Sequence, residues 1–348
     1  MAQGVASAPA PRQEAAPAFK EPPERRNGHR HTYGAIDLGT NNCRLLIARP
    51  DGASFTVVDA FSRIVRLGEG LSQSGRLSDV AMDRAVAALG VCADKLRRRN
   101  VSLSRSVATE ACRRAANGKT FVDRVRQETG IALDIIEPQE EARLAMLGCH
   151  KLLEPGDGPA LIFDIGGGST ELVLIDQSDD GPKIRSWWSA PWGVVSLTES
   201  EGRQAIEGDD RLLAYGRMRE RARRSFGRFA TTLPKRRKGI RLLGTSGTVT
   251  TLASVHLALP SYDRRAVDGL HVPAKAMQEI SAMIAGMDYS QRAALSCIGP
   301  ERADLVVAGC AILEAILDIW PAEKLGVADR GIREGILRSL MARDGYLL

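Results

Sequence analysis

The stretch LIFDIGGGSTELVLID, from Leu161 to Asp176, decides the fold of this chain. Two apolar runs of β type flank three consecutive glycines, a pattern that predicts a hairpin whose turn needs positive φ and an open backbone. Bare backbone N–H groups in such a turn bind phosphate oxygens, and the carboxylates of Asp164 and Glu171 beside it can hold Mg²⁺ or orient water. An ordinary tight hairpin with acidic flanks is the alternative interpretation of this sequence, because glycine-rich motifs are common.

The same pattern occurs earlier, in YGAIDLGTNNCRLLIAR from Tyr33 to Arg49. An apolar run ends at Asp37, Gly39 and small polar residues follow, and a second apolar run comes next. A duplicated hairpin predicts two similar domains that face each other and contribute one phosphate-binding turn each.

Bulk properties agree with this organisation. The 348 residues suggest about two domains, and the net charge of +6 indicates an anionic partner without saying which one. The six cysteines include no CxxC pair, which argues against structural zinc and favours reduced thiols in a cytoplasmic protein. The most apolar stretch, Leu305 to Trp320, is too short to span a bilayer. Residues 1–30 have the composition of a disordered tail with basic residues, and they lack a secretion signal.

Between the two hairpins, the pattern predicts strands at Phe55 to Ala60 and Ile64 to Leu67 and a helix from about Ser78 to Arg98. A further helix begins near Glu137 and carries Glu140 and Glu141 in its first turn. Carboxylates there complement the helix dipole, which is a sufficient structural reason for them. A role in chemistry is the alternative, because this helix leads directly to the glycine hairpin.

Five motifs together resemble the exopolyphosphatase and guanosine pentaphosphate phosphohydrolase (Ppx/GppA) family of the actin, Hsp70 and sugar-kinase superfamily. The resemblance implies an α/β protein of two actin-like (ribonuclease H-like) domains, each a mixed five-stranded sheet with flanking helices, and a ligand cleft between them. It implies a first domain at residues 31–136, a second at 137–330, and a last helix within 331–348 that packs back on the first. The motifs are ATEACRRAAN (108–117), EEARLAMLG (140–148), FDIGGGSTELV (163–173), GTSGTVTTLA (244–253) and GIREGIL (331–337).

The resemblance also assigns roles to residues. Glu141 matches the catalytic carboxylate that activates water, Arg113 matches an arginine that contacts phosphate, and Glu171 joins them in the catalytic set. One departure is Asn42, where many members carry a hydroxyl residue. The metal ligands implied are Asp37, Asp164 and Glu171. The implied phosphate contacts are Asp37, Gly39, Thr40, Asn41, Asn42, Gly166, Gly167, Gly168, Ser169, Gly244, Ser246 and Gly247.

The activity implied is release of terminal phosphate from inorganic polyphosphate, from guanosine pentaphosphate, or from both, with Mg²⁺ or Mn²⁺. We expect a cytoplasmic enzyme that binds no nucleic acid and no membrane and can form a homodimer. An actin-like ATPase or sugar kinase, and a non-catalytic alarmone or polyphosphate sensor, are the alternatives. The basic segment Arg217 to Arg241 fits a solvated helix face and loop, or an electrostatic funnel for a long polyanion.

Overall fold

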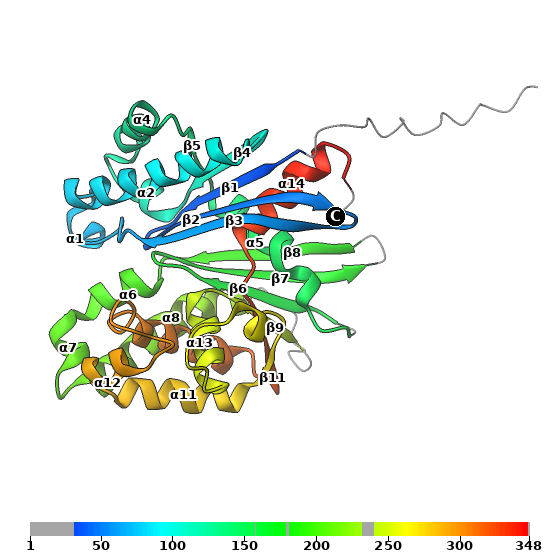
Figure 1. The fold of residues 1–348 in the computed structure, drawn as a ribbon. Coiled ribbons are helices and arrows are strands. Elements are labelled where there is room, and N and C mark those ends of the chain that lie inside the picture. The colour runs from blue at the N-terminus through cyan, green and yellow to red at the C-terminus, as the bar shows by residue number, and fades with distance from the viewer. Residues whose placement is uncertain (1–30, 157, 179–180, 232–239, 347–348) are drawn as a thin grey trace, which may run out of the picture. The chain divides into compact units, whose positions relative to one another are not determined.

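Two β-sheets organise the chain (Figure 1). The structure, a computed structural model, describes residues 31–156, 158–178, 181–231 and 240–346. In the first sheet the strand order is β3-β2-β1-β4-β5, with β1–β2 and β2–β3 antiparallel and the other pairs parallel. Its strands are β1 (Tyr33–Leu38), β2 (Asn42–Asp51), β3 (Ser54–Ile64), β4 (Leu103–Ala108) and β5 (Leu133–Ile135).

Helices cover both faces of the first sheet. Side chains alternate along β1, so Ile36 and Leu38 pack in the core that contains α2 and α4, whereas Tyr33 and Ala35 pack in the core that contains α14. The predicted helix near residue 78 is confirmed, because Ser78 caps it by accepting a hydrogen bond from the Ala81 N–H. These helices are α2 (Asp79–Arg98), α4 (Gly118–Thr129) and α14 (Ile332–Arg343).

The second sheet has the order β10-β11-β9-β6-β7-β8 and so contains six strands rather than the predicted five. The extra strand is β10, three residues that end in proline, and a segment so short shows no alternation of apolar and polar residues. The predicted fold class is confirmed by the two mixed sheets with flanking helices. The strands are β6 (Ala160–Ile165), β7 (Thr170–Ser178), β8 (Gly181–Ala190), β9 (Arg241–Thr245), β10 (His271–Pro273) and β11 (Lys324–Ala328).

Helix α5 (Pro138–Cys149) packs against both sheets. Its Ala142 and Met146 lie in a core with β6 and β7, while Leu144 and Ala145 lie in the core that α14 forms with β1. Because α5 carries Glu141, this double packing fixes that carboxylate relative to both sheets. The predicted boundary near residue 136 separates the strands of the two sheets, but it stays a prediction because α5 and α14 join the two sides.

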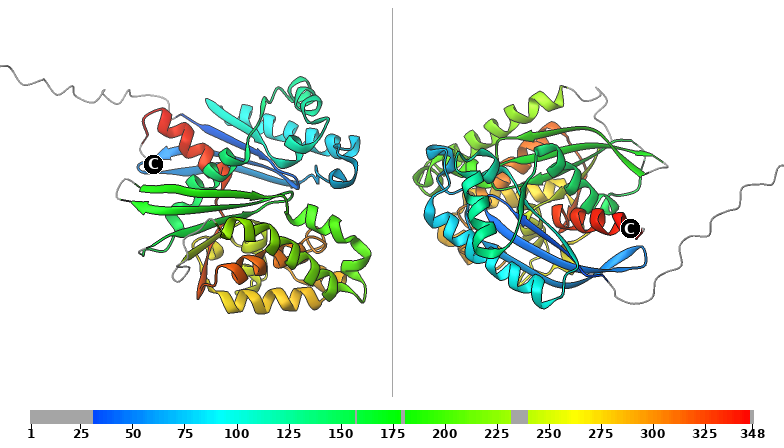
Figure 2. Two further views of the ribbon diagram at one scale, coloured as in Figure 1. Left: turned by 180° about the vertical axis from the view of Figure 1, so that it is seen from behind. Right: turned by 90° about the horizontal axis from the view of Figure 1, so that it is seen from above.

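The remaining helices lie mainly with the second sheet, whose other face packs on α8 and α13 (Figures 1 and 2). They are α6 (Val194–Glu201), α7 (Arg203–Glu207), α8 (Arg211–Ala230), α9 (Gly247–His256), α10 (Arg264–Val267), α11 (Ala274–Gly286), α12 (Tyr289–Ala294) and α13 (Val306–Ile319). Two short helices, α1 (Leu71–Ser74) and α3 (Glu110–Arg114), belong to the first half, and a 3-10 turn, η1 (His150–Leu152), follows α5.

Several expectations concern other segments. The strands predicted at 55–60 and 64–67 are one strand, β3, after which Val65 to Leu67 leave the sheet. Most arginines of α8 form ion pairs, with Glu201, Glu220, Glu314 or Asp318, which favours the solvated helix face over a funnel. The predicted tail and Lys235 to Lys238 lie outside the described residues. No helix in the described part of the chain is long and apolar enough to cross a membrane.

Candidate active site

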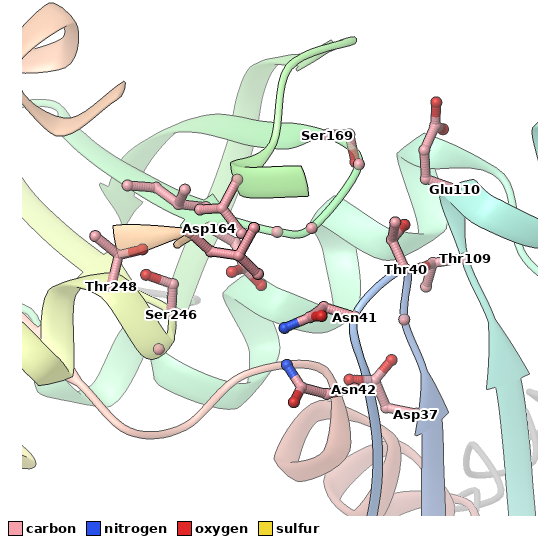
Figure 3. A pocket seen from close by; sticks show the side chains of 18 of the residues that line it. Asp37, Thr40, Asn41, Asn42, Thr109, Glu110, Asp164, Ser169, Ser246 and Thr248 are labelled. Carbon is pink, nitrogen blue, oxygen red and sulfur yellow. The ribbon is translucent and has the colours of Figure 1, made fainter. Parts of the chain in front are cut away.

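A pocket of about 120 Å³ lies where the two predicted phosphate turns meet (Figure 3). This volume has room for several water molecules or one phosphate group. Among the predicted site residues, only Arg113 and Gly244 are absent from its wall. The pocket is lined by Asp37, Gly39, Thr40, Asn41, Asn42, Arg44, Thr109, Glu110, Glu141, Asp164, Ile165, Gly166, Gly167, Gly168, Ser169, Glu171, Val194, Ser246, Gly247, Thr248, Thr251, Arg302, Leu305, Val306 and Ile332.

The second turn presents a row of backbone N–H groups to the pocket. The carbonyl groups of Gly166–Gly168 accept hydrogen bonds of 2.8–3.3 Å from the first three residues of α6. A trans peptide group directs its N–H opposite to its carbonyl, so the N–H groups of the next residues, through Ser169, point away from α6. Consecutive N–H groups on one side form an anion-binding concavity. The predicted open turn is therefore present, but the positive φ predicted for it is wrong, because none of its three glycines lies in the left-handed region.

The first turn is built in the same way. The carbonyl of Asn41 accepts from the N–H groups of Val65 and Arg66 at 2.8 and 3.0 Å, and the carbonyl of Thr40 accepts from the Gly68 N–H at 2.9 Å. The N–H of Asn41 consequently faces away from this segment. The side chains of Asn41 and Asn42 point toward the side of the pocket where Ser246 lies (Figure 3).

The two turns are in direct contact. A Cβ atom added to Gly167 would lie 2.9 Å from the Cβ of Thr40 and 3.1 Å from the backbone nitrogen of Asn41. Real Cβ atoms do not approach other atoms so closely, so a residue with a side chain at this position would push the turns apart. The glycine thus allows the two turns to lie in close contact.

Four carboxylates line the pocket, of which Glu141 and Glu171 are buried and Asp37 and Asp164 are partly exposed. Burial, then the charge of Glu171, raises the pKa of Asp164 to about 8. Burial also raises the pKa of Glu171 to about 7, against the opposing effect of hydroxyl donors such as Ser189, 2.9 Å away. The pKa of Glu141 is raised well above its ordinary value, first by burial and then by Glu171. Burial raises the pKa of Asp37 as well. Such clusters of raised pKa values are typical of functional sites.

Arg113 lies behind Glu141 rather than on the pocket wall. Its Nη1 donates to the Ile136 carbonyl at 2.6 Å and to Glu141 Oε2 at 3.4 Å, and its Nη2 donates to Glu110 Oε2 at 2.6 Å. With its donors engaged in this way, Arg113 orients Glu141 and opposes the rise of its pKa. The predicted contact with phosphate stays a prediction. Gly244, a residue of β9, packs against Phe163 of β6 and does not line the pocket.

Two arginines that the sequence analysis did not select, Arg44 and Arg302, line the pocket. Arg302 Nη1 donates to Thr251 Oγ1 at 3.1 Å, and among the described residues neither arginine forms an ion pair. Burial, then the nearby charge of Arg44, lowers the pKa of Arg302. Two cations at the pocket favour an anionic ligand, although the charge of Arg44 also acts on Asp37 and Asp164, where it opposes the rise of pKa that burial causes. Arg44 could have been found from the sequence, because it lies opposite Asp37 in the register of the predicted hairpin.

Helix α9 adds a third anion-binding element. It begins at Gly247, and Ser246 caps it by accepting a hydrogen bond from the Val249 N–H at 3.2 Å. The first N–H groups of a helix carry partial positive charge and bind anions. Ser246, Gly247 and Thr248 all line the pocket, so the predicted strand, turn and helix bring donors to the same place as the two turns.

The carboxylates fit a divalent cation in charge and donor chemistry. Five acidic and two basic side chains line the pocket, so a cation would offset the charge of those carboxylates that are ionised. The buried Oδ1 of Asp37 has no hydrogen-bond partner. No three acidic, histidine or cysteine side chains of the described residues are close enough to hold an ion by themselves. A Mg²⁺ ion, which keeps several waters and takes one or two carboxylates, fits this arrangement.

The fold and the pocket define an α/β protein with two mixed sheets and a pocket between two backbone turns. The chain belongs to the Ppx/GppA phosphatase family, whose sequence profile matches residues 46–344. The actin-like fold predicted from the motifs is confirmed by this membership and by solved structures. The chain superposes on the Aquifex aeolicus family member with a TM-score of 0.74 and 27% identity, over 90% of this chain and 99% of that one.

Relatives of two kinds are similar to this chain. Exopolyphosphatase 2 of Mycobacterium tuberculosis is 32% identical over 325 residues, 88% of this chain and 97% of that protein. Guanosine-5'-triphosphate,3'-diphosphate pyrophosphatase of Aeromonas hydrophila is 28% identical over 320 residues, 90% of this chain but 60% of that protein. A crystal structure of an exopolyphosphatase-like protein has a TM-score of 0.80 and 27% identity. The chain is therefore a phosphatase of this family, similar to relatives with two different named substrates.

Proposed function

We propose that this protein hydrolyses a terminal phosphoanhydride bond, releasing orthophosphate from inorganic polyphosphate, from guanosine pentaphosphate, or from both. The observation that carries this proposal is the position of Glu141, a buried carboxylate of raised pKa, at a pocket walled by two backbone anion sites. N–H groups of both turns bind the oxygens of the end phosphate, and charge that develops there in the transition state is stabilised by donors already in place.

Glu141 acts as the general base that takes a proton from the attacking water. An efficient base has a pKa near the working pH, and burial beside Glu171 raises the pKa of Glu141 in that direction. Arg113 limits this rise and holds the carboxylate in one orientation through Nη1. Glu171, held by Ser189, directs the water from the other side. General-base catalysis of this kind contributes about 10²–10⁴-fold to a rate.

Mg²⁺ or Mn²⁺ would be held by Asp37, Asp164 and Glu171, directly or through water. When bound, the ion neutralises phosphate charge and lowers the pKa values of the neighbouring carboxylates. Arg44 and Arg302, which form no ion pair among the described residues, bind phosphate oxygens from the pocket wall. We place the enzyme in the cytoplasm, where both substrates occur as soluble polyanions.

The test compares Glu141→Gln with Glu140→Gln. Glu140 is the adjacent residue of α5, but its carboxylate binds Arg105 and Arg143 and does not line the pocket. We expect Glu141→Gln to lower kcat by about 10²–10⁴-fold and Glu140→Gln to change it less than threefold. Orthophosphate release is measured with polyphosphate, guanosine pentaphosphate and ATP. Equal kcat values for both variants would refute the role of Glu141.

The same assay separates the alternative functions. A kinase-like enzyme would release phosphate from ATP alone. A sensor would bind polyphosphate or guanosine pentaphosphate tightly and release nothing.

A further inference from the structure

The segment Val65–Ser72, here called the strap, connects the first phosphate turn with α6. Its first residues donate to the carbonyl groups of Thr40 and Asn41 and so hold the first turn. Its last residues reach Glu199 of α6, because the Gly70 N–H donates to Glu199 Oε1 at 2.7 Å and Ser72 Oγ donates to the same carboxylate. One side chain of α6 therefore binds the segment that shapes the first turn.

Glu199 belongs to the helix that shapes the other turn. The first three residues of α6 bind the carbonyl groups of Gly166–Gly168, and Glu199 lies on the next turn of the same short helix. Each phosphate turn thus has one supporting element, and the Glu199 carboxylate joins the two supports. Glu199 does not line the pocket.

Arg66 makes a second connection from the strap. Its Nη1 and Nη2 donate to the two carboxylate oxygens of Asp304 at 2.9 and 3.4 Å, and Nη2 also lies 3.4 Å from the Glu301 carbonyl. Asp304 is two residues from the pocket arginine Arg302. The strap is therefore tied both to α6 and to the segment that supplies a pocket cation.

The backbone of Arg66 is strained. Its φ angle is +47°, in the left-handed region that side-chain-bearing residues seldom adopt. Its N–H donates to Asn41, and its carbonyl accepts from Arg84 Nη2 at 3.2 Å, so both ends of the residue are held. Strain that the surroundings maintain in this way is characteristic of functional positions.

We propose that Glu199 and Arg66 are positioning residues that fix the spacing of the two phosphate turns. The proposal rests on the proposed function, because the spacing matters when one phosphoryl group must contact both turns. A misplacement of about 1 Å can lower a rate about 10²-fold. These ion pairs and hydrogen bonds are partly exposed, with 32% of the Arg66 side chain accessible, and exposed pairs contribute little to stability. Loss of these contacts should therefore lower the reaction rate much more than the stability of the fold.

Amide hydrogen exchange tests the connection without any substrate. We expect Glu199→Ala to increase exchange at least about tenfold at the hydrogen-bonded amides of both turns, those of Gly39 and Gly166, although Glu199 contacts neither. Ser200→Ala, on the same helix, is the control and should leave both turns unchanged. Faster exchange confined to the strap would overturn the proposal. If α6 itself loses protection, Arg66→Ala decides, because Arg66 does not touch α6 and its replacement should still increase exchange at Gly39.

Kinetics test the consequence for the reaction. We expect Arg66→Ala and Glu199→Ala to lower kcat by about tenfold to 10²-fold, Arg66→Lys and Glu199→Gln to recover part of the loss, and Arg76→Ala to change nothing. Arg76 is exposed and lies just beyond the strap. Lower thermal stability with wild-type kcat and KM would show a structural role only. If the exchange results hold while the wild-type protein releases no phosphate, the positioning proposal stands and the proposed function fails.

Discussion

Replacing Asp164 by asparagine should stabilise the fold, and the gain should grow with pH. Asp164 is the penultimate residue of β6. It is partly exposed and lines the pocket together with Glu171. Burial, then the charge of Glu171, raises its pKa from 3.8 to about 8. An unfolded chain releases this proton near pH 4, whereas the folded protein keeps it to near pH 8. In that range the folded state binds more protons, so the stability of the wild-type protein falls as pH rises.

The size of the effect follows from the pKa difference. One pKa unit corresponds to about 1.4 kcal/mol, so the full shift is worth on the order of 5 kcal/mol. Water entering the pocket reduces this limit, and we expect Asp164→Asn to gain about 1–3 kcal/mol over the wild type between pH 5 and pH 8. Asparagine has nearly the same shape as aspartate, so the substitution creates no cavity.

Urea unfolding at a series of pH values, with chelator present, measures this difference. Asp123→Asn is the control, because Asp123 is an exposed carboxylate on α4 outside the pocket, and its difference from the wild type should not change with pH. Added Mg²⁺ should stabilise the wild-type protein more than Asp164→Asn. A free-energy difference that stays constant or shrinks from pH 5 to pH 8 would refute the assignment of a buried, raised-pKa carboxylate to Asp164.

Two further substitutions test other parts of the site. Arg44→Ala should raise KM for polyphosphate about 10- to 100-fold, because it removes charge-assisted hydrogen bonds worth about 1.5–3 kcal/mol, while Arg63→Ala on the neighbouring strand should not; equal KM values would contradict the assignment. Gly335→Ala should destabilise the protein by about 1–3 kcal/mol in thermal unfolding, because its Cβ would lie 2.0 Å from the Leu144 carbonyl oxygen of α5. Gly216→Ala, which meets nothing within 4 Å, should be neutral or stabilising.

The hairpins were predictable because their signals are local. An apolar run, an acidic residue, glycines and a second apolar run specify strand, turn and strand within about sixteen residues, and both copies, at Asp37 and Asp164, form antiparallel pairs as predicted. The start of α9 was predictable for the same reason, since the strand and the capping Ser246 are adjacent in sequence. Local sequence patterns therefore predicted most of the residues that line the pocket.

The other pocket residues depend on long-range packing. Arg302 lies about 260 residues after the first turn, and nothing near it in sequence indicates that it faces Arg44. The position of Arg113 also depends on tertiary contacts, because the Ile136 carbonyl and Glu110 take the donors that the motif assigned to phosphate. The direction of a long side chain is decided by such tertiary partners, and these partners cannot be predicted from local sequence patterns.

The construction of the turns also explains why Asn42 is compatible with phosphate binding. A hydroxyl at that place would supply one side-chain donor. The turns, however, offer backbone N–H groups as donors, and in the first turn these are free because the strap binds the carbonyl groups. Asn42 brings its own amide N–H donors to the pocket wall, so the exchange replaces one donor type by another. The demanding positions are instead those where a side chain would separate the turns, above all Gly167, which lies against Thr40. Anion binding at this site therefore depends on the path of the backbone, and the residues that hold this path, including Glu199 and Arg66, matter as much as those that face the phosphate.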